Sequence, residues 1–152
     1  MPVQRLKKFL DENDVRYVTI SHSPSYTSLE VAASAHVKGQ QLAKTVMVKL
    51  DGKMAMAVLP ASYAVDLDLL QVETGASSSA LATEAEFATL FPGCELGAMP
   101  PFGNLYGMKV YAEQSLEANA DIAFNAGTHR ELVKLAWKDF LRLVQPVVIK
   151  FA

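Results

Sequence analysis

The stretch that decides the fold is residues 43–60, AKTVMVKLDGKMAMAVLP, in which two apolar runs flank Asp51-Gly52. Asp-Gly is a preferred pair for the two-residue turn of a β-hairpin. Such a turn fixes the register, so Leu50 should lie opposite Lys53, and Lys44 opposite Leu59. The sequence therefore predicts a tight antiparallel hairpin in this part of the chain.

Both faces of this hairpin are largely apolar. Because strand side chains alternate, one face should carry Lys44, Val46, Val48, Leu50, Ala55, Ala57 and Leu59. The other face should carry Thr45, Met47, Met54, Met56 and Val58. A hairpin that is apolar on both sides belongs in a sheet that is covered on both faces.

Helical and strand patterns interleave around the hairpin. Helices are predicted near residues 3–12, 28–36, 65–75, 83–91 and 138–144, the fourth with a capping box of Thr83 and Glu86. Strands are predicted near residues 16–20, 108–112, 121–127 and 131–136. The expected fold class is therefore α/β or α+β, with a mixed sheet in a single domain spanning residues 1–152.

Composition limits the classes of site. The 152 residues are 51% hydrophobic, and no apolar run reaches the roughly 18 residues of a membrane span, so a cytoplasmic protein without membrane contact is expected. The single cysteine, Cys94, excludes an internal disulfide, and the three histidines lack zinc-type spacing. No metal or other cofactor is expected.

Charge is distributed unevenly along the chain. Residues 1–53 hold eight Lys or Arg against five Asp or Glu, residues 54–127 hold one against nine, and residues 128–152 hold five against two. The net charge of −2 argues against an extended nucleic-acid groove and against DNA as a partner. If the two basic ends meet in the fold, they could offer a small positive surface to a phosphate group, although ordinary solvated faces are the more common explanation.

Three features are candidates for chemistry. Lys44 places an ammonium group on an apolar strand face, which suits a pocket wall, unless the side chain reaches water from the strand end. His129 follows Gly127 in a turn, where a histidine is either functional or a plain surface residue. In residues 96–104, LGAMPPFGN, the prolines fix a rigid loop whose N–H groups at Gly97 and Ala98 could face a substrate oxygen. The same loop could equally be a crossover that packs Met99 and Phe102 into the core.

Covalent catalysis and nucleotide hydrolysis are not supported. The chain has no G-x-S-x-G elbow, and Cys94 has no evident base beside it in the sequence. GKMAMAVL, residues 52–59, lacks the glycine spacing and the Ser or Thr of a phosphate-binding loop.

Taken in order, these features resemble the YbaK/EbsC family, the editing domains associated with prolyl-tRNA synthetase that also occur as free-standing trans-editing proteins. The resemblance runs from HSPSYTS through AKTVMVKLDGKMAMAVLPASYAVDL and GAMPPFG to FNAGTHRELVKL. It is most specific at Lys44-Thr45, at the G-x-x-x-P loop from Gly97 to Pro101, and at His129 after its Ala-Gly turn.

The resemblance implies a compact domain around a curved mixed sheet that hydrolyses the ester of a mischarged tRNA carrying Ala, Ser, Thr or Cys. By similarity, Lys44, Gly97 and His129 should be catalytic. The substrate-binding residues should be Thr45, Ala98, Met99, Pro101 and Phe102. The implied partners are the acceptor end of the tRNA and an aminoacyl-tRNA synthetase.

This chain also departs from one branch of the family. In the alanine-clearing members that this chain resembles, the lysine is followed by asparagine. Here Lys44 is followed by Thr45, which is closer to other branches of the family. A different class of function is a non-catalytic module that uses the same pocket to bind an amino acid or another small ligand. A third is a structural protein, in which Lys44 would be solvent-exposed and no pocket would lie beside Gly97.

Overall fold

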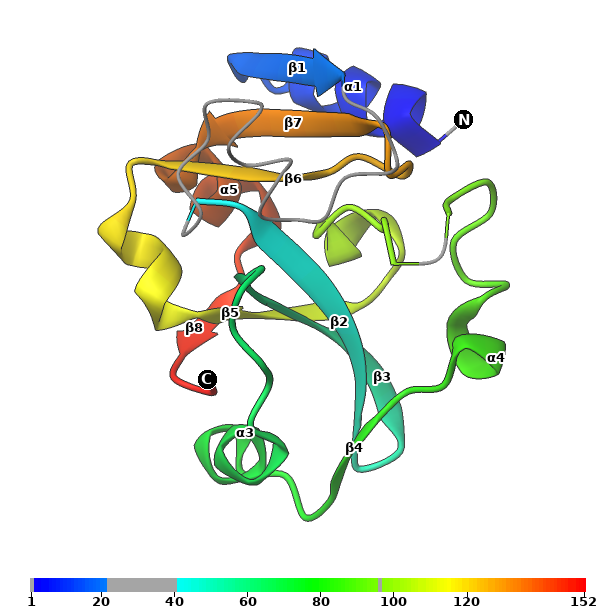
Figure 1. Cartoon of the computed structure of the whole chain (residues 1–152), viewed down its shortest axis with the longest axis vertical. Coiled ribbons are helices and arrows are strands. Elements are labelled where there is room, and N and C mark those ends of the chain that lie inside the picture. Colours follow the sequence, from blue (N-terminus) through cyan, green and yellow to red (C-terminus); the bar gives the residue numbers. More distant parts are fainter. Residues whose placement is uncertain (1, 22–40, 96) are drawn as a thin grey trace.

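The computed structural model describes residues 2–21, 41–95 and 97–152, and the helix predicted near residues 28–36 lies outside these ranges. A three-stranded antiparallel sheet has the order β1 (Tyr17–Ser21), β7 (Glu131–Ala136), β6 (Asp121–Asn125). A five-stranded sheet has the order β4 (Ser79–Leu81), β2 (Ala43–Leu50), β3 (Lys53–Pro60), β5 (Lys109–Glu113), β8 (Val147–Ile149). The smaller sheet lies at the top of Figure 1 and the larger one below it.

The larger sheet is mixed, as expected. β2 pairs with β3 and β4 in antiparallel fashion, whereas β5 pairs in parallel with β3 and β8. An isolated parallel bridge between Leu42, the residue before β2, and Ala123 links the two sheets. The mixed α/β architecture confirms the predicted fold class.

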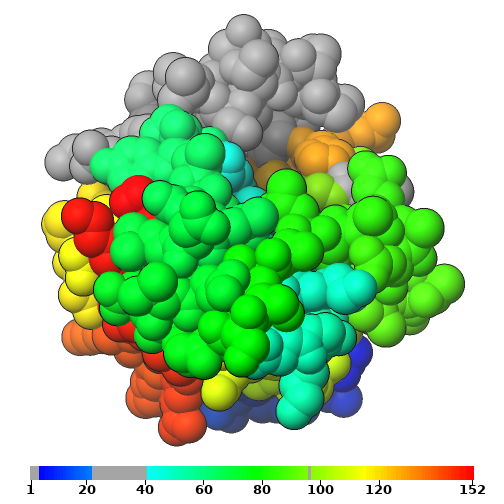
Figure 2. All heavy atoms as spheres, turned by 90° about the horizontal axis from the view of Figure 1, so that it is seen from below, coloured from blue at the N-terminus to red at the C-terminus, as the bar shows by residue number. Residues whose placement is uncertain are grey.

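The hairpin forms in the predicted register. Leu50 lies opposite Lys53 and Lys44 lies opposite Leu59, as Asp51-Gly52 requires. Asp51 and Gly52 both have positive φ, at 52° and 79°, which the favoured hairpin turn needs at its two central residues. Seen from the hairpin turn, the two strands lie between the α3 region and the α4 region (Figure 2).

Within the described ranges, four short helices surround the sheets: α1 (Pro2–Glu12), α3 (Leu67–Thr74), α4 (Glu84–Phe87) and α5 (Trp137–Val144). Two 3₁₀ turns, η1 (Gly103–Leu105) and η2 (Gln114–Ala118), precede and follow β5. All four helices were predicted, although α4 is a single turn. The strands β4 and β8 were missed because three residues are too few to display a period.

The two faces of the hairpin carry separate cores, as the alternation predicts. On the Thr45 face, Met47, Met56 and Val58 pack in a cluster that also contains residues of α1 and α5. On the Lys44 face, residues of β2 and β3 pack with α3 and the C-terminal segment, through Val48, Leu50, Ala55, Ala57, Leu59, Leu70 and Phe151. β2 therefore lies between two apolar layers.

The two basic ends of the chain lie side by side, because β1 pairs with β7. Much of their charge is paired locally. Lys7 lies 2.8 Å from Glu131, and Lys134 lies 4.0 Å from Asp121. This favours ordinary solvated faces over the positive surface that the charge pattern allowed. In the described ranges no helix is long and apolar enough to cross a membrane.

Candidate active site

A hollow of about 260 Å³ opens beside the outer edge of β2. Three residues that the sequence predicts to act on substrate, Thr45, Gly97 and Met99, line this hollow together. The rest of its lining is Val46, Met47, Leu81, Ala82, Glu84 and Phe87. Segments separated by about fifty positions thus converge on one small space.

The edge of β2 at this hollow is not covered by β4. β4 pairs with residues Val48 to Leu50, and the last bond on this side is donated by the Ala82 N–H to the Met47 carbonyl at 2.9 Å. Backbone groups two residues apart on a strand point to the same edge. The Thr45 N–H and carbonyl therefore point toward the hollow, beyond the end of β4.

Two backbone hydrogen bonds tie the Gly97 loop to the turn that carries His129. The Glu95 N–H donates to the Gly127 carbonyl, and the Gly127 N–H donates to the Ala98 carbonyl, both at 2.8 Å. Gly97 has φ of +84°, and a Cβ placed there would lie 3.5 Å from Cε1 of His129. The imidazole of His129 thus lies against Gly97, although His129 itself is not among the residues that line the hollow.

Ala98 does not offer the N–H group that the sequence suggested. Its N–H donates to the Glu95 carbonyl at 3.0 Å, and its side chain is fully buried. The tight turn that gives Gly97 its positive φ uses this bond. The Ala98 N–H is therefore already engaged within the loop, and Gly97 and Met99 are the loop residues that line the hollow.

Phe102 is a core residue. Its ring is fully buried and lies 6.1 Å from Phe9, 5.5 Å from Phe124 and 5.7 Å from Phe140, measured between ring centroids. Pro101 is also buried. The loop therefore combines both alternatives, since Phe102 anchors it in the core while Gly97 and Met99 form the wall of the hollow. A contact between Phe102 and substrate is not supported by this position.

Lys44 lies one residue before Thr45 and is half-buried. Its side chain lies on the same face of the hairpin as that of Val46, which lines the hollow, but Lys44 itself is not among the lining residues. None of the ion pairs between described residues includes Lys44. Lys44 therefore lies next in sequence to a residue that lines the hollow, without lining the hollow itself.

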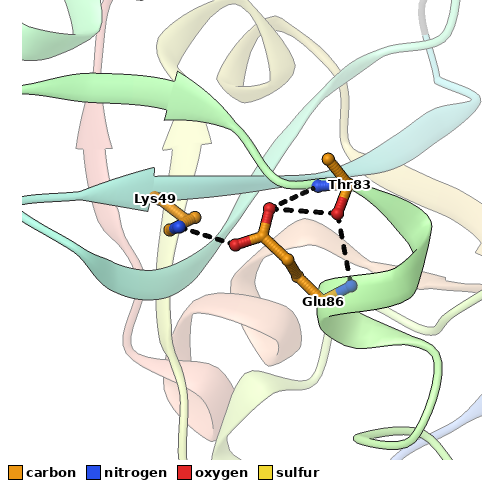
Figure 3. A network of polar contacts seen from close by, with 3 residues as sticks. All are labelled: Lys49, Thr83 and Glu86. Carbon is orange, nitrogen blue, oxygen red and sulfur yellow. Dashed lines mark hydrogen bonds and ion pairs between the residues drawn. The ribbon is translucent and has the colours of Figure 1, made fainter.

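A network of polar contacts holds α4 against β2 (Figure 3). Thr83 and Glu86 form the predicted capping box, with Oε1 of Glu86 accepting from the Thr83 N–H at 3.0 Å. The other carboxylate oxygen accepts from Nζ of Lys49 at 2.6 Å. These contacts lower the pKa of Glu86 from 4.5 to about 2, chiefly through the hydrogen bond from Lys49 and then through those from Thr83.

The Lys49–Glu86 contact gives a pH prediction. Because the pKa of Glu86 is depressed in the folded protein, its contribution to stability is complete above about pH 4.5 and is lost as the pH falls through about 2. The carboxyl group is solvent-exposed, so the contribution is small. We expect NMR titration of Glu86 to give a pKa near 2, and Lys49→Met to raise it. An unchanged pKa in Lys49→Met would contradict the assigned cause.

Gly97→Ala should impair the site by changing the backbone. An alanine at positive φ costs roughly 1–2 kcal/mol, while the Cβ position at 3.5 Å from His129 leaves space for a methyl group. Gly107, at φ of +68° with nothing within 4 Å of its Cβ position, is the matched control. Both alanine variants should lose similar thermal stability. Only Gly97→Ala should lower the rate of the reaction at this site, on the order of 10- to 100-fold, because the new backbone conformation would shift the loop and His129. Equal activity losses would show that strain alone is responsible.

Cys94 is not among the residues that line the hollow. Burial raises the pKa of the Cys94 thiol, which disfavours the nucleophilic thiolate. Its sulfur lies 3.9 Å from the Tyr106 hydroxyl. Within the described part of the chain, no three His, Cys, Asp or Glu residues are grouped as metal ligands would be.

Sequence reasoning missed the wall that α4 and β4 provide. Leu81, Ala82, Glu84 and Phe87 line the hollow, and none of them was a candidate. The capping box located α4 in the sequence but gave no sign of its packing partner. That position depends on the pairing of β4 with β2 and on the contact between Lys49 and Glu86.

Comparison with known proteins places this geometry in a family. The family model described as the aminoacyl-tRNA editing domain matches residues 22–143. The protein named multifunctional Ser/Thr-tRNA deacylase ProXp-y from Escherichia coli strain K12 is 31% identical over 156 residues, covering 97% of this chain and 91% of that protein. Its namesake from Escherichia coli O157:H7 matches to the same extent.

A solved structure has the same fold. It is a candidate trans-editing enzyme for prolyl tRNA synthetase, with a TM-score of 0.84, 20% sequence identity, and coverage of 99% of this chain and 96% of the other. At this identity the likeness shows the fold alone. With the family model spanning most of its length and a relative above 30% identity, the chain belongs to the aminoacyl-tRNA editing domain family.

Proposed function

We propose that this protein acts in trans to hydrolyse the ester of a mischarged tRNA that carries serine or threonine. The observation that carries this proposal is the meeting of Thr45, Gly97 and Met99 around one small hollow, with His129 against Gly97. The relative named a Ser/Thr-tRNA deacylase supports the choice of amino acids.

The groups at the hollow suit hydrolysis of an activated ester. An aminoacyl ester needs only a positioned water and donors for the oxyanion of the tetrahedral intermediate. The N–H groups of Gly97 and Thr45 would supply those donors. The proton from the attacking water would pass to His129, to the 2′-hydroxyl of the substrate or to solvent. A covalent nucleophile is not required.

Lys44 would bind the tRNA rather than the amino acid. Its ammonium is a charged donor next to the open edge of β2, and Lys44 is not among the residues that line the hollow. A phosphate next to the terminal ribose would accept from it while the aminoacyl group enters the hollow. Lys44 would thereby hold the ester bond over Gly97 and Thr45.

The hollow would admit small side chains and separate them poorly. Met47, Phe87 and Met99 limit its volume, and Thr45 adds a hydroxyl that can pair with the hydroxyl of serine or threonine. An apolar pocket distinguishes amino acids that differ by one methyl or hydroxyl group by only about 10- to 200-fold. Slower clearance of alanine and cysteine is therefore expected.

The test is a panel of tRNAs charged with Ser, Thr, Ala or Cys, incubated with the protein under single-turnover conditions. The proposal predicts loss of the ester faster than the spontaneous rate, with Ser and Thr ahead of Ala and Cys. The alternative of a non-catalytic amino-acid-binding module predicts binding of free serine or threonine and only spontaneous loss of every ester.

Contact with tRNA phosphates should make the reaction sensitive to salt. Raising the salt concentration should reduce kcat/KM, because screening weakens attraction between Lys44 and phosphate. A rate independent of salt would remove phosphate binding from the proposal. The same proposal includes the acceptor end of the tRNA and an aminoacyl-tRNA synthetase as partners, and a cytoplasmic location.

A further inference from the structure

We infer that Glu84 binds the α-ammonium group of the amino acid, an inference that rests on the proposed function. An aminoacyl ester carries one positive group, its ammonium, beside an ester and a phosphate backbone that are neutral or negative. A site that selects aminoacyl-tRNA over uncharged tRNA therefore gains from a carboxylate at the amino-acid end.

Glu84 supplies the single charged side chain among the described residues that line the hollow. Its companions there are apolar residues, Thr45 and Gly97, and no Lys or Arg is among them. None of the ion pairs between described residues includes Glu84. The hollow thus combines apolar walls with one uncompensated negative charge, as a pocket for a small ammonium compound would.

The rest of α4 is arranged to keep Glu84 in this position. Glu86, two residues later, is occupied by Lys49 and by the capping box with Thr83 (Figure 3). Residues two apart on a helix point to different sides. The contacts of Glu86 therefore fix α4 on β2 and leave the Glu84 carboxylate on the side of the hollow.

The competing role for Glu84 is structural. A carboxylate in the first turn of a helix is stabilised by the helix dipole, typically by about 0.3–1 kcal/mol. That role does not depend on the substrate having an ammonium group. The two roles are therefore separable by changing the substrate as well as the residue.

The experiment compares seryl-tRNA with N-acetyl-seryl-tRNA, which lacks the positive charge. After each rate is divided by the spontaneous hydrolysis rate of the same ester, wild-type protein should favour seryl-tRNA by about 10- to 100-fold in kcat/KM, the range expected for a hydrogen bond between charged groups. Glu84→Gln should lose most of this preference while its rate on the acetylated substrate stays near that of wild type. Glu73→Gln, an exposed change on α3, is the control and should keep the preference.

Two results would overturn the inference: Glu84→Gln keeps the full preference, or it lowers both rates equally. If wild-type protein cleaves neither ester, the proposed function fails. The role of Glu84 is then tested separately, by measuring the binding of substrate analogues. Titration with an amide-linked seryl-adenosine and its N-acetyl form should then show tighter binding of the free-amine form by wild type. Equal binding of the two forms by wild type would refute the role of Glu84.

Discussion

Lys44→Ala is expected to reduce the single-turnover rate of ester hydrolysis by about 100-fold or more, with little change in stability. Lys44 is proposed to hold the ester bond over Gly97 and Thr45, and a misplacement of the reacting groups by about 1 Å can cost about 100-fold in rate. Lys44 is half-buried at the start of β2, and no described ion pair depends on it. The loss should therefore appear in activity rather than in folding.

The matched control is Lys53→Ala. Lys53 pairs with Leu50, so it lies on the same face of the hairpin as Lys44 but at the opposite end. This variant should keep the wild-type rate and show a similar melting temperature. If Lys44→Ala cleared the ester as fast as Lys53→Ala, Lys44 would have no part in the reaction.

Phe102→Ala is expected to lower the free energy of unfolding by roughly 3–5 kcal/mol, the usual cost of removing a buried phenylalanine ring. Phe102 is fully buried and contacts the rings of Phe9, Phe124 and Phe140. These residues come from α1, β6 and α5, so one ring joins three elements. The resulting cavity would be lined by rigid aromatic groups that cannot easily close it.

Urea-induced unfolding measures this effect, with Leu90→Ala as the control because Leu90 is 39% exposed. Leu90→Ala should lower the free energy of unfolding by less than half as much as Phe102→Ala. A Phe102→Ala variant of nearly normal stability that had lost activity would instead place Phe102 in contact with substrate, as the sequence first suggested.

Local patterns made the framework predictable. Asp51-Gly52 specifies both the turn and the register of the hairpin. The alternation of side chains along the two strands then assigns hairpin residues correctly to the two cores. Thr83 and Glu86 likewise specify the start of α4. Such signals depend on residues a few positions apart, which interact in the same way in many proteins.

The site was less predictable because it depends on contacts between distant segments. The sequence singled out Gly97, Thr45 and Met99, which do share a hollow, but it also grouped Ala98 and Phe102 with them. Whether a loop residue turns inward depends on the turn at Glu95 and on the position of the aromatic core. Glu84 could not be found at all, since it reaches the hollow only through the packing of α4 on β2.

The central claim is that this protein cleaves the ester of a seryl- or threonyl-tRNA. The most direct measurement is the rate at which labelled serine is released from mischarged tRNA under saturating protein, compared with the rate in buffer alone. We expect release well above the spontaneous rate, with intact tRNA and free serine as the products. Release at the spontaneous rate from both seryl- and threonyl-tRNA would contradict it.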